Sequence, residues 1–204
     1  MSEKKIKELL DGRKPKVIGL TREYAVMILL AVADGKLSFV FEKRSGSIKQ
    51  PGDVCFPGGK VEPGETVVEC ALRETAEEIN ITDVEVLGRY DSQYELSGIG
   101  LHSVVGLVSF DNLKKALPNK TEVEKIIIVP VEFFQKNEPM IYDYDILQDV
   151  SDFPYEEVGI RADYKWRKGH QQIPIYKFEE EVIWGLTGTF VKRLAEEMRD
   201  YGDI

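Results

Sequence analysis

Apolar residues along the chain form short runs separated by glycine, proline and charged residues, a pattern that favours strands over long helices. Two such runs, residues 24–32 and 37–41, flank Asp34-Gly35, and Asp-Gly between apolar runs predicts a β-hairpin. Residues 44–51 are polar and broken by glycine and proline, so we expect a loop there. Further strands are expected at 53–56, 84–90, 101–110 and 125–129. The pattern therefore predicts many strands and few helices.

Three segments are expected to be helical, at residues 3–10, 65–79 and about 180–199. The last is amphipathic, because its apolar residues recur at helical spacing. Residues 137–175 mix aspartate, aromatic, proline and glycine residues without a clean period, which predicts an irregular insertion or lid. The sequence contains no internal repeat and no low-complexity linker, so residues 1–204 are expected to form a single domain.

Composition limits the classes of partner. With 204 residues, of which 43% are hydrophobic, the chain can bury one substantial core. Its net charge of −9 argues against binding to nucleic acid or to anionic membranes, because both rely on a positive surface. Cys55 and Cys70 suggest no disulfide framework and favour a reducing compartment. We expect a cytoplasmic protein, because neither a signal peptide nor an apolar run of membrane-spanning length is evident.

The predicted helix at 65–79 carries a cluster of acids. At about 100° per residue, Glu74, Glu77 and Glu78 lie together, roughly opposite an apolar stripe. Neighbouring like charges destabilise a helix by a few tenths of a kcal/mol per pair, a cost that a cation would remove. Oxygen-rich sites of this kind suit Mg²⁺ or Mn²⁺. The alternative for such a helix standing alone is an ordinary solvated acidic face.

The loop that precedes this helix favours a binding site. Pro57-Gly58-Gly59 allows a tight turn with carbonyl groups exposed near the helix, and the Gly58 carbonyl is a candidate metal ligand. Glu65 lies at the helix start, where the helix dipole favours a negative charge. Arg73 follows about two turns later and is placed to reach back to Glu65. Such a pair would fix the loop against the helix.

These residues closely resemble the signature of the Nudix hydrolases. The signature here runs Gly59, five residues, Glu65, seven residues, and then the acidic helix from Arg73. Two positions depart from it: Thr75 replaces an apolar residue, and Asn80 replaces the glycine that ends the helix. Asn is the next-best residue for a left-handed helix end. The resemblance implies an α/β (α+β) fold, in which helices sandwich a mixed β-sheet.

A second resemblance points to the coenzyme A pyrophosphatases within that superfamily. It rests on Arg44-Ser45, Ile48-Lys49 and residues 52–59, together with Ile183-Trp184-Gly185-Leu186-Thr187 near the C-terminus. The chain departs from that pattern at residues 49–51, where Lys-Gln-Pro is one residue shorter and lacks a histidine. Coenzyme A or a derivative is the substrate this resemblance favours, and ADP-ribose or a dinucleotide of the NADH type is the alternative.

The Nudix resemblance implies hydrolysis of a diphosphate bridge in a small nucleoside diphosphate derivative. It implies catalytic roles for Glu65 and Arg73 and for three acids that also hold the metal. Those three are Glu74, Glu77 and Glu78, with Gly58 contributing a carbonyl. Metal is obligatory under this hypothesis, because a diphosphate approaching these acids would otherwise be repelled.

Phosphate contacts require positive charge nearby, and Arg44, Lys49 and Lys60 are the candidates. Some family members take their general base from a distant loop, and the candidates for that role are Glu95, Glu122 and Glu124. His102 lies in an apolar run and is expected to be structural.

Other interpretations fit some of the same residues. The aromatic residues between Tyr142 and Trp166 suit base stacking, a homodimer contact or a satellite core equally well. A nucleotide-sensing module would keep the fold without turnover, and a purely structural protein would bind no metal-dependent ligand. The intact Glu74, Glu77 and Glu78 argue for the enzyme.

Overall fold

The computed structural model describes residues 3–47 and 49–202, so Ile48 of the second motif lies outside the described residues. The helices are α1 (Glu3–Leu10), α2 (Val67–Ile79), α3 (Phe110–Leu113), α4 (Val131–Lys136), α5 (Tyr155–Val158) and α6 (Gly185–Asp200). The strands are β1 (Arg22–Ala33), β2 (Lys36–Arg44), β3 (Val54–Cys55), β4 (Gly58–Lys60), β5 (Glu85–Tyr94), β6 (Ile99–Val108), β7 (Val123–Pro130), β8 (Met140–Ile146), β9 (Gly169–Phe178) and β10 (Glu181–Trp184). No described helix is both long and apolar enough to span a membrane.

A mixed sheet forms the centre of the molecule. Its strands follow the order β3-β2-β1-β6-β5, with β4 paired to β1 and β7 paired to β2. The predicted hairpin is present: β1 and β2 run antiparallel through the Asp34-Gly35 turn. The β1 and β6 strands run parallel, which makes the sheet mixed. The expected fold class is therefore confirmed.

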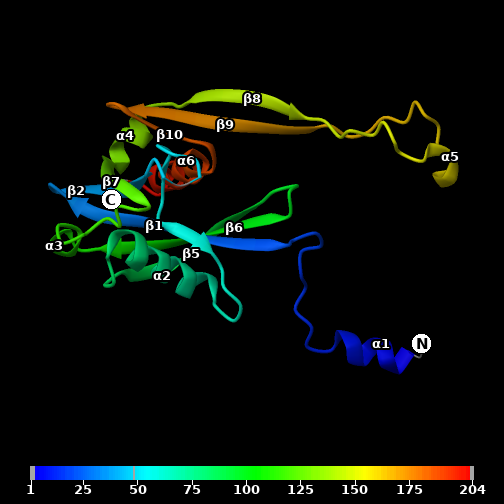
Figure 1. The fold of residues 1–204 in the computed structure, drawn as a ribbon, viewed down its shortest axis with the longest axis horizontal. Helices are drawn as coiled ribbons and strands as arrows, with labels where there is room; N and C mark the ends of the chain where they lie inside the picture. Colours follow the sequence, from blue (N-terminus) through cyan, green and yellow to red (C-terminus); the bar gives the residue numbers. More distant parts are fainter. Residues whose placement is uncertain (1–2, 48, 203–204) are drawn as a thin grey trace.

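Helices cover both faces of this sheet (Figure 1). Alternate residues of β1 divide between two cores, because successive side chains of a strand point to opposite faces. Met27 and Leu29 pack in the core that includes Cys70 and Ile79 of α2. Ile28 and Leu30 pack in the core that includes Phe134 of α4 and Phe190 of α6. We call residues 58–81 the box. Its helix α2 and the C-terminal helix α6 therefore lie on opposite sides of the sheet.

Several predicted boundaries were wrong. The β2 strand continues to Arg44, three residues beyond the predicted end, because Glu42 and Lys43 still pair with β7. The turn predicted at Pro57-Gly58-Gly59 is in part a strand, since β4 pairs antiparallel with β1. Both errors have one cause: short polar strands next to glycine lack the apolar run that sequence reasoning requires.

Residues 137–175 are only partly irregular, which corrects the expected insertion. Their two ends form β8 and β9, which pair antiparallel from Met140 with Ile175 to Ile146 with Gly169. A second, three-stranded sheet results, in the order β10-β9-β8. In Figure 1 this ribbon extends away from the central sheet and ends in the loop that holds α5. We call residues 140–178 the arm.

The predicted helix at 180–199 is a strand followed by a helix. Residues 181–184 form β10 and pair with β9, and α6 begins at Gly185. Gly185 adopts a φ of 64°, a left-handed conformation that separates the strand from the helix. Apolar residues within β10 also fit the helical period, which explains the error.

Both ends of α2 are fixed by local chemistry. The helix begins two residues later than predicted, because Thr66 is the N-cap and forms a capping box with Glu69. It ends at Asn80, whose φ of 57° and ψ of 36° are left-handed, as expected for this substitution of glycine. Thr75 is fully buried and donates its hydroxyl to the carbonyl of Ala71 at 2.6 Å. The two departures from the signature thus keep the helix intact.

Candidate functional site

The Arg73 guanidinium binds three acids, one in the loop before α2 and two on α2 itself. Its Nε and Nη2 donate to the two carboxylate oxygens of Glu65, at 2.8 and 3.1 Å. Its Nη1 donates to Glu74 at 2.8 Å and to Glu77 at 3.1 Å, and Nη2 also reaches the carbonyl of Lys60 at 3.2 Å. The predicted contact between Arg73 and Glu65 is confirmed.

This clamp has a clear electrostatic effect on Glu65. The hydrogen bonds from Arg73, together with the backbone N–H of Glu62, lower the pKa of Glu65 to about 2. The Glu65 carboxylate therefore stays ionised near neutral pH and holds the loop against α2. A bidentate arginine–carboxylate pair also fixes orientation, because both groups are planar.

The two box glycines make room for the acids. A Cβ at Gly59 would lie 2.7 Å from the Oε2 atom of Glu74, inside the space that this carboxylate occupies. A Cβ at Gly58 would lie 2.7 Å from the Cα of Val26. Gly58 is therefore required by the close approach of the β1 backbone, whereas a side chain at residue 59 would displace the Glu74 carboxylate.

Glu78 is not on a solvated face of the helix. Its residue is 6% exposed, and its Oε2 accepts the backbone N–H of Gly58 at 2.8 Å. Glu77 is exposed and Glu74 is half-buried, so the acids of α2 span the full range from core to solvent. The expectation of one polar face was wrong, because the helix lies close to β4.

Glu42 of β2 lies beside Glu78, although neither motif includes it. It is 1% exposed, and its carboxyl interacts electrostatically with that of Glu78. Burial raises the pKa of both groups, and the charge of Glu42 raises the pKa of Glu78 further. Two buried carboxyl groups side by side cannot both ionise without a compensating positive charge.

The signal for Glu42 was present in the sequence. Val40 faces the α2 core, so the residue two positions later on the same strand faces it as well. A glutamate at an inward position of a buried strand is unusual. It was missed because the predicted strand ended at residue 41.

Of the three predicted phosphate ligands, Arg44 is the one whose charge acts on the pair of Glu42 and Glu78. Its positive charge lowers the pKa of both Glu42 and Glu78. Its Nε donates to the backbone carbonyl of Lys49 at 3.0 Å, which orders the loop after β2. Lys49 and Lys60 are exposed. The backbone carbonyl of Lys49 accepts a hydrogen bond from Arg44, and that of Lys60 accepts one from Arg73.

Glu122 is the candidate base whose charge acts on the acids of the site. Its charge raises the pKa of both Glu42 and Glu74. The backbone of Ser45 donates to the Glu122 carbonyl at 2.8 Å, so the end of β2 positions this loop. Glu95 instead accepts the hydroxyl of Ser97 at 3.0 Å, and Glu124 is exposed on β7.

His102 has a partner for each ring nitrogen. Nδ1 lies 2.8 Å from the Ser92 hydroxyl, and Nε2 lies 3.1 Å from a Glu23 carboxylate oxygen. It is buried in β6, in agreement with the structural role expected for it.

The donor set fits a hard divalent cation, because it consists of carboxylate oxygens and backbone carbonyls. Among residues 3–47 and 49–202, no three His, Cys, Asp or Glu side chains are already arranged around one point that could hold a metal ion. Glu74 and Glu77 are turned toward Arg73 instead. A cation must therefore draw them away from this guanidinium.

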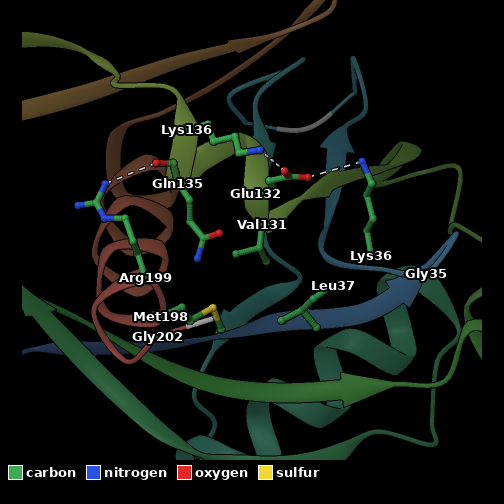
Figure 2. Close-up of a pocket in the computed structure, with 10 residues that line it drawn as sticks. All are labelled: Gly35, Lys36, Leu37, Val131, Glu132, Gln135, Lys136, Met198, Arg199 and Gly202. Atoms are coloured by element: carbon green, nitrogen blue, oxygen red, sulfur yellow. Dashed lines mark hydrogen bonds and ion pairs between the residues drawn. The ribbon is translucent and has the colours of Figure 1, made fainter. Parts of the chain in front are cut away.

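A cavity of about 450 Å³ lies elsewhere, between the β1–β2 turn, α4 and α6 (Figure 2). None of the predicted site residues lines it. Among its charged side chains, Glu132 pairs with both Lys36 and Lys136, and Arg199 donates to the backbone carbonyl of Gln135. The carboxyl cluster and this cavity are separate features.

A NUDIX domain model matches residues 21–149, well over half of the chain. The chain belongs to the Nudix family. The matched region contains β1, β2, the box loop and α2, so it includes the whole carboxyl cluster described above.

Individual relatives agree with this assignment. The chain is 37% identical over 113 residues to Nudix hydrolase 3 of Caenorhabditis elegans, an alignment that covers 53% of this chain and 47% of the relative. It is 34% identical over 137 residues to the mouse peroxisomal coenzyme A diphosphatase NUDT7, with coverage of 65% and 57%. The chain thus matches only about half the length of these two proteins.

A bacterial relative matches along nearly the whole chain. The uncharacterized Nudix hydrolase NudL of Photorhabdus laumondii is 28% identical over 190 residues, covering 91% of this chain and 90% of the relative. A MutT/nudix family protein from Enterococcus faecalis shares the fold, with a TM-score of 0.54 at 12% identity, over 98% of this chain and 70% of that one. The arm therefore lies within the span of both matches.

Proposed function

We propose that this Nudix protein hydrolyses the diphosphate bridge of a small nucleoside diphosphate derivative, with coenzyme A or a derivative as the leading substrate. The observation that carries the proposal is the intact box, in which Arg73 gathers Glu65, Glu74 and Glu77 beside the buried Glu78. The similarity to a coenzyme A diphosphatase supports the narrower choice.

We assign the metal site to Glu77 and Glu78 as main ligands, with Glu74 as a ligand or base and the Gly58 carbonyl as a further donor. Bound Mg²⁺ or Mn²⁺ would neutralise phosphate charge and lower the pKa of a coordinated water. The Gly58 N–H orients Glu78 through the 2.8 Å hydrogen bond, and Arg73 orients the exposed Glu77. A cation would draw Glu74 and Glu77 from Arg73 toward Glu78.

The remaining residues position the substrate. Arg44 lies beside the carboxyl pair and carries a guanidinium suited to two parallel bonds with a phosphate. Lys49 and Lys60 are exposed and free to approach the same phosphates. Glu122 is the favoured external base among the three candidates, because its charge acts on both Glu42 and Glu74.

The net charge of −9 supports a small, metal-screened substrate over nucleic acid or anionic lipid. We also propose a cytoplasmic location and a homodimer.

The aromatic residues of the arm contact one another, as in the pair of Phe153 and Trp166, whose ring centroids lie 4.8 Å apart.

A substrate panel tests the proposal. The purified chain is incubated with Mg²⁺ or Mn²⁺ and with coenzyme A, ADP-ribose or NADH, and the products are identified by mass in ¹⁸O-labelled water. We expect two phosphomonoesters from coenzyme A, one of which carries the label. Turnover of ADP-ribose with coenzyme A untouched would overturn the narrower choice, and no turnover of any diphosphate would overturn the proposal.

A further inference from the structure

Glu42 is a buried carboxylate with an unsatisfied oxygen. Its Oε1 accepts a weak hydrogen bond from the Sγ of Cys55 at 3.6 Å. Its Oε2 is buried and has no hydrogen-bond partner among the residues that the structure describes. Such an oxygen is costly, because a buried polar atom that loses water and gains no partner forfeits its full solvation.

The surroundings of Glu42 make the unsatisfied oxygen more unusual. Its carboxyl interacts with that of Glu78, which is itself buried and oriented by the Gly58 N–H. Arg44 supplies positive charge nearby but directs its Nε toward the Lys49 carbonyl. The protein therefore places two carboxyl groups in one poorly solvated space with incomplete compensation.

Two arrangements satisfy this geometry: a proton shared between the two carboxyl groups, or a cation held by both. A shared proton would satisfy the free oxygen of Glu42 but would keep one group neutral, whereas a carboxylate must be deprotonated to bind a metal, as the role proposed for Glu78 requires. A cation uses the oxygens of both groups, and oxygen donors of this type favour hard divalent ions. The second arrangement also explains why the pair lies next to Arg44, since a phosphate bound to the cation would then meet a guanidinium.

We infer that Glu42 is a carboxylate ligand of the divalent-cation site, outside the box and shared with Glu78. The inference rests on the proposed function and extends it to a residue on β2. The cation site accordingly spans the sheet and the helix, so that metal binding joins β2 to α2. Glu42 thus carries a role that the box alone does not provide.

The alternative is a protonated, purely structural acid, and two substitutions separate it from the inference. Glu42→Gln imitates the protonated acid with the same size, whereas Glu42→Asp keeps the charge and withdraws it by one methylene. Glu181→Gln is the matched control, because Glu181 is also buried but is already paired with Lys43 and Lys125. All variants are compared as full-length, metal-free protein.

Binding of Mn²⁺ alone is measured by calorimetry and by the loss of the free-ion signal in electron paramagnetic resonance. We expect Glu42→Gln to raise the dissociation constant for Mn²⁺ by about tenfold or more, a loss comparable to that from removing partners of metal ligands. Glu42→Asp should also weaken binding, and Glu181→Gln should bind as the wild type does. Wild-type affinity in Glu42→Gln would overturn the inference.

Thermal melting in EDTA provides the second readout. We expect Glu42→Gln to melt at or above the wild-type temperature, because a neutral amide removes the like-charge contact with Glu78 and can donate to it. Glu181→Gln should melt lower, since it leaves two lysines unpaired. A melting temperature of Glu42→Gln well below that of the wild type would show that the charged group stabilises the metal-free fold, and would overturn the inference.

The outcomes also separate the inference from the proposed function. Wild-type protein that binds Mn²⁺ while Glu42→Gln binds equally well contradicts the role of Glu42 alone. Wild-type protein that binds no Mn²⁺, with or without a nucleoside diphosphate, contradicts both.

Discussion

The box and the arm differ in how their polar groups are satisfied. In the box, one guanidinium serves Glu65, Glu74 and Glu77 at once, and two carboxyl groups are buried together at its edge. In the arm, polar groups pair locally, as when the Nε1 of Trp166 donates to the Tyr155 hydroxyl at 3.1 Å. The box buries charged groups together, whereas the ion pairs of the arm join exposed side chains.

Position in the fold explains this difference. The box lies where β2, β4, α2 and the loop before β7 meet, so residues distant in sequence share one space. The arm is a ribbon that leaves the central sheet, so its residues mostly meet their own neighbours (Figure 1). Substitutions at matched positions in the two regions should therefore differ in effect.

The largest contrast concerns catalysis. Glu78→Gln should lower kcat by about 100-fold or more, because it removes a buried charge aimed at the metal site, and losses of this size follow removal of one catalytic donor. The control is Tyr144→Phe in the arm, which deletes only the hydrogen bond from the Tyr144 hydroxyl to Gln171 at 2.5 Å. Steady-state rates and circular dichroism of both variants check this. Equal loss in the two variants would remove the distinction between the regions.

The next contrast concerns packing. Gly58→Ala should destabilise the fold by about 1–3 kcal/mol, as expected for overpacking, because the added Cβ would meet the backbone of Ala25 and Val26. Gly88→Ala is the control, since a Cβ there meets nothing within 4 Å. Urea unfolding gives both free energies. Similar stability of the two variants would show that β4 can move away from β1 without cost.

A smaller effect is expected from two arginine pairs of similar geometry. The Arg73 side chain is 27% exposed and its partner Glu65 is 14% exposed, whereas the values are 86% and 65% for Arg161 and Asp163 in the arm. Arg73→Lys should cost about 1 kcal/mol and reduce kcat, because lysine cannot reproduce the paired bonds. Arg161→Lys should change stability by roughly 0–1 kcal/mol, as is usual for an exposed pair. Reversed magnitudes in urea unfolding would contradict the assignment of Arg73 as a clamp.

The smallest effects are pH-dependent and have opposite signs in the two regions. The pKa of Glu65 is about 2, below its ordinary 4.5, so its stabilisation is complete above pH 4.5 and is lost as pH falls toward 2. In the arm, Asp145 and Asp143 raise the pKa of His170, so its contribution is complete below about 6.5 and is lost as pH rises through the raised pKa.

Substitutions isolate each of these titrations. Glu65→Gln should flatten the stability profile on the acid side, and His170→Gln should flatten it above pH 6.5. Unfolding free energies from pH 2 to 8 check both. A profile that Glu65→Gln leaves unchanged at acid pH would contradict the clamp.

Sequence reasoning identified the box because its chemistry is local. Arg73 and Glu65 are eight residues apart across a single loop and helix, so the long Arg73 side chain can reach back to the residue that precedes the N-cap. The left-handed conformation of Asn80 follows from residue type in the same way. These features required no knowledge of the sheet.

Features that depend on the sheet were harder to predict. The inward position of Glu42 follows from alternation along β2, but its approach to Glu78 depends on how β2 and α2 pack, which sequence spacing does not encode. The β8–β9 pairing depends on two strands separated by a loop of more than twenty residues, and its exposed residues show no strong apolar alternation. Burial pattern is the main signal for strands, and it is weak in an exposed ribbon.

The central claim is that the carboxylates of Glu74, Glu77 and Glu78, joined by Glu42, hold divalent cations for a diphosphate substrate. Calorimetric titration of the metal-free wild-type protein with Mn²⁺, alone and with a nucleoside diphosphate, tests this most directly. The account predicts saturable binding that tightens with the nucleotide and is lost in Glu78→Gln. Absence of binding in both titrations would contradict it.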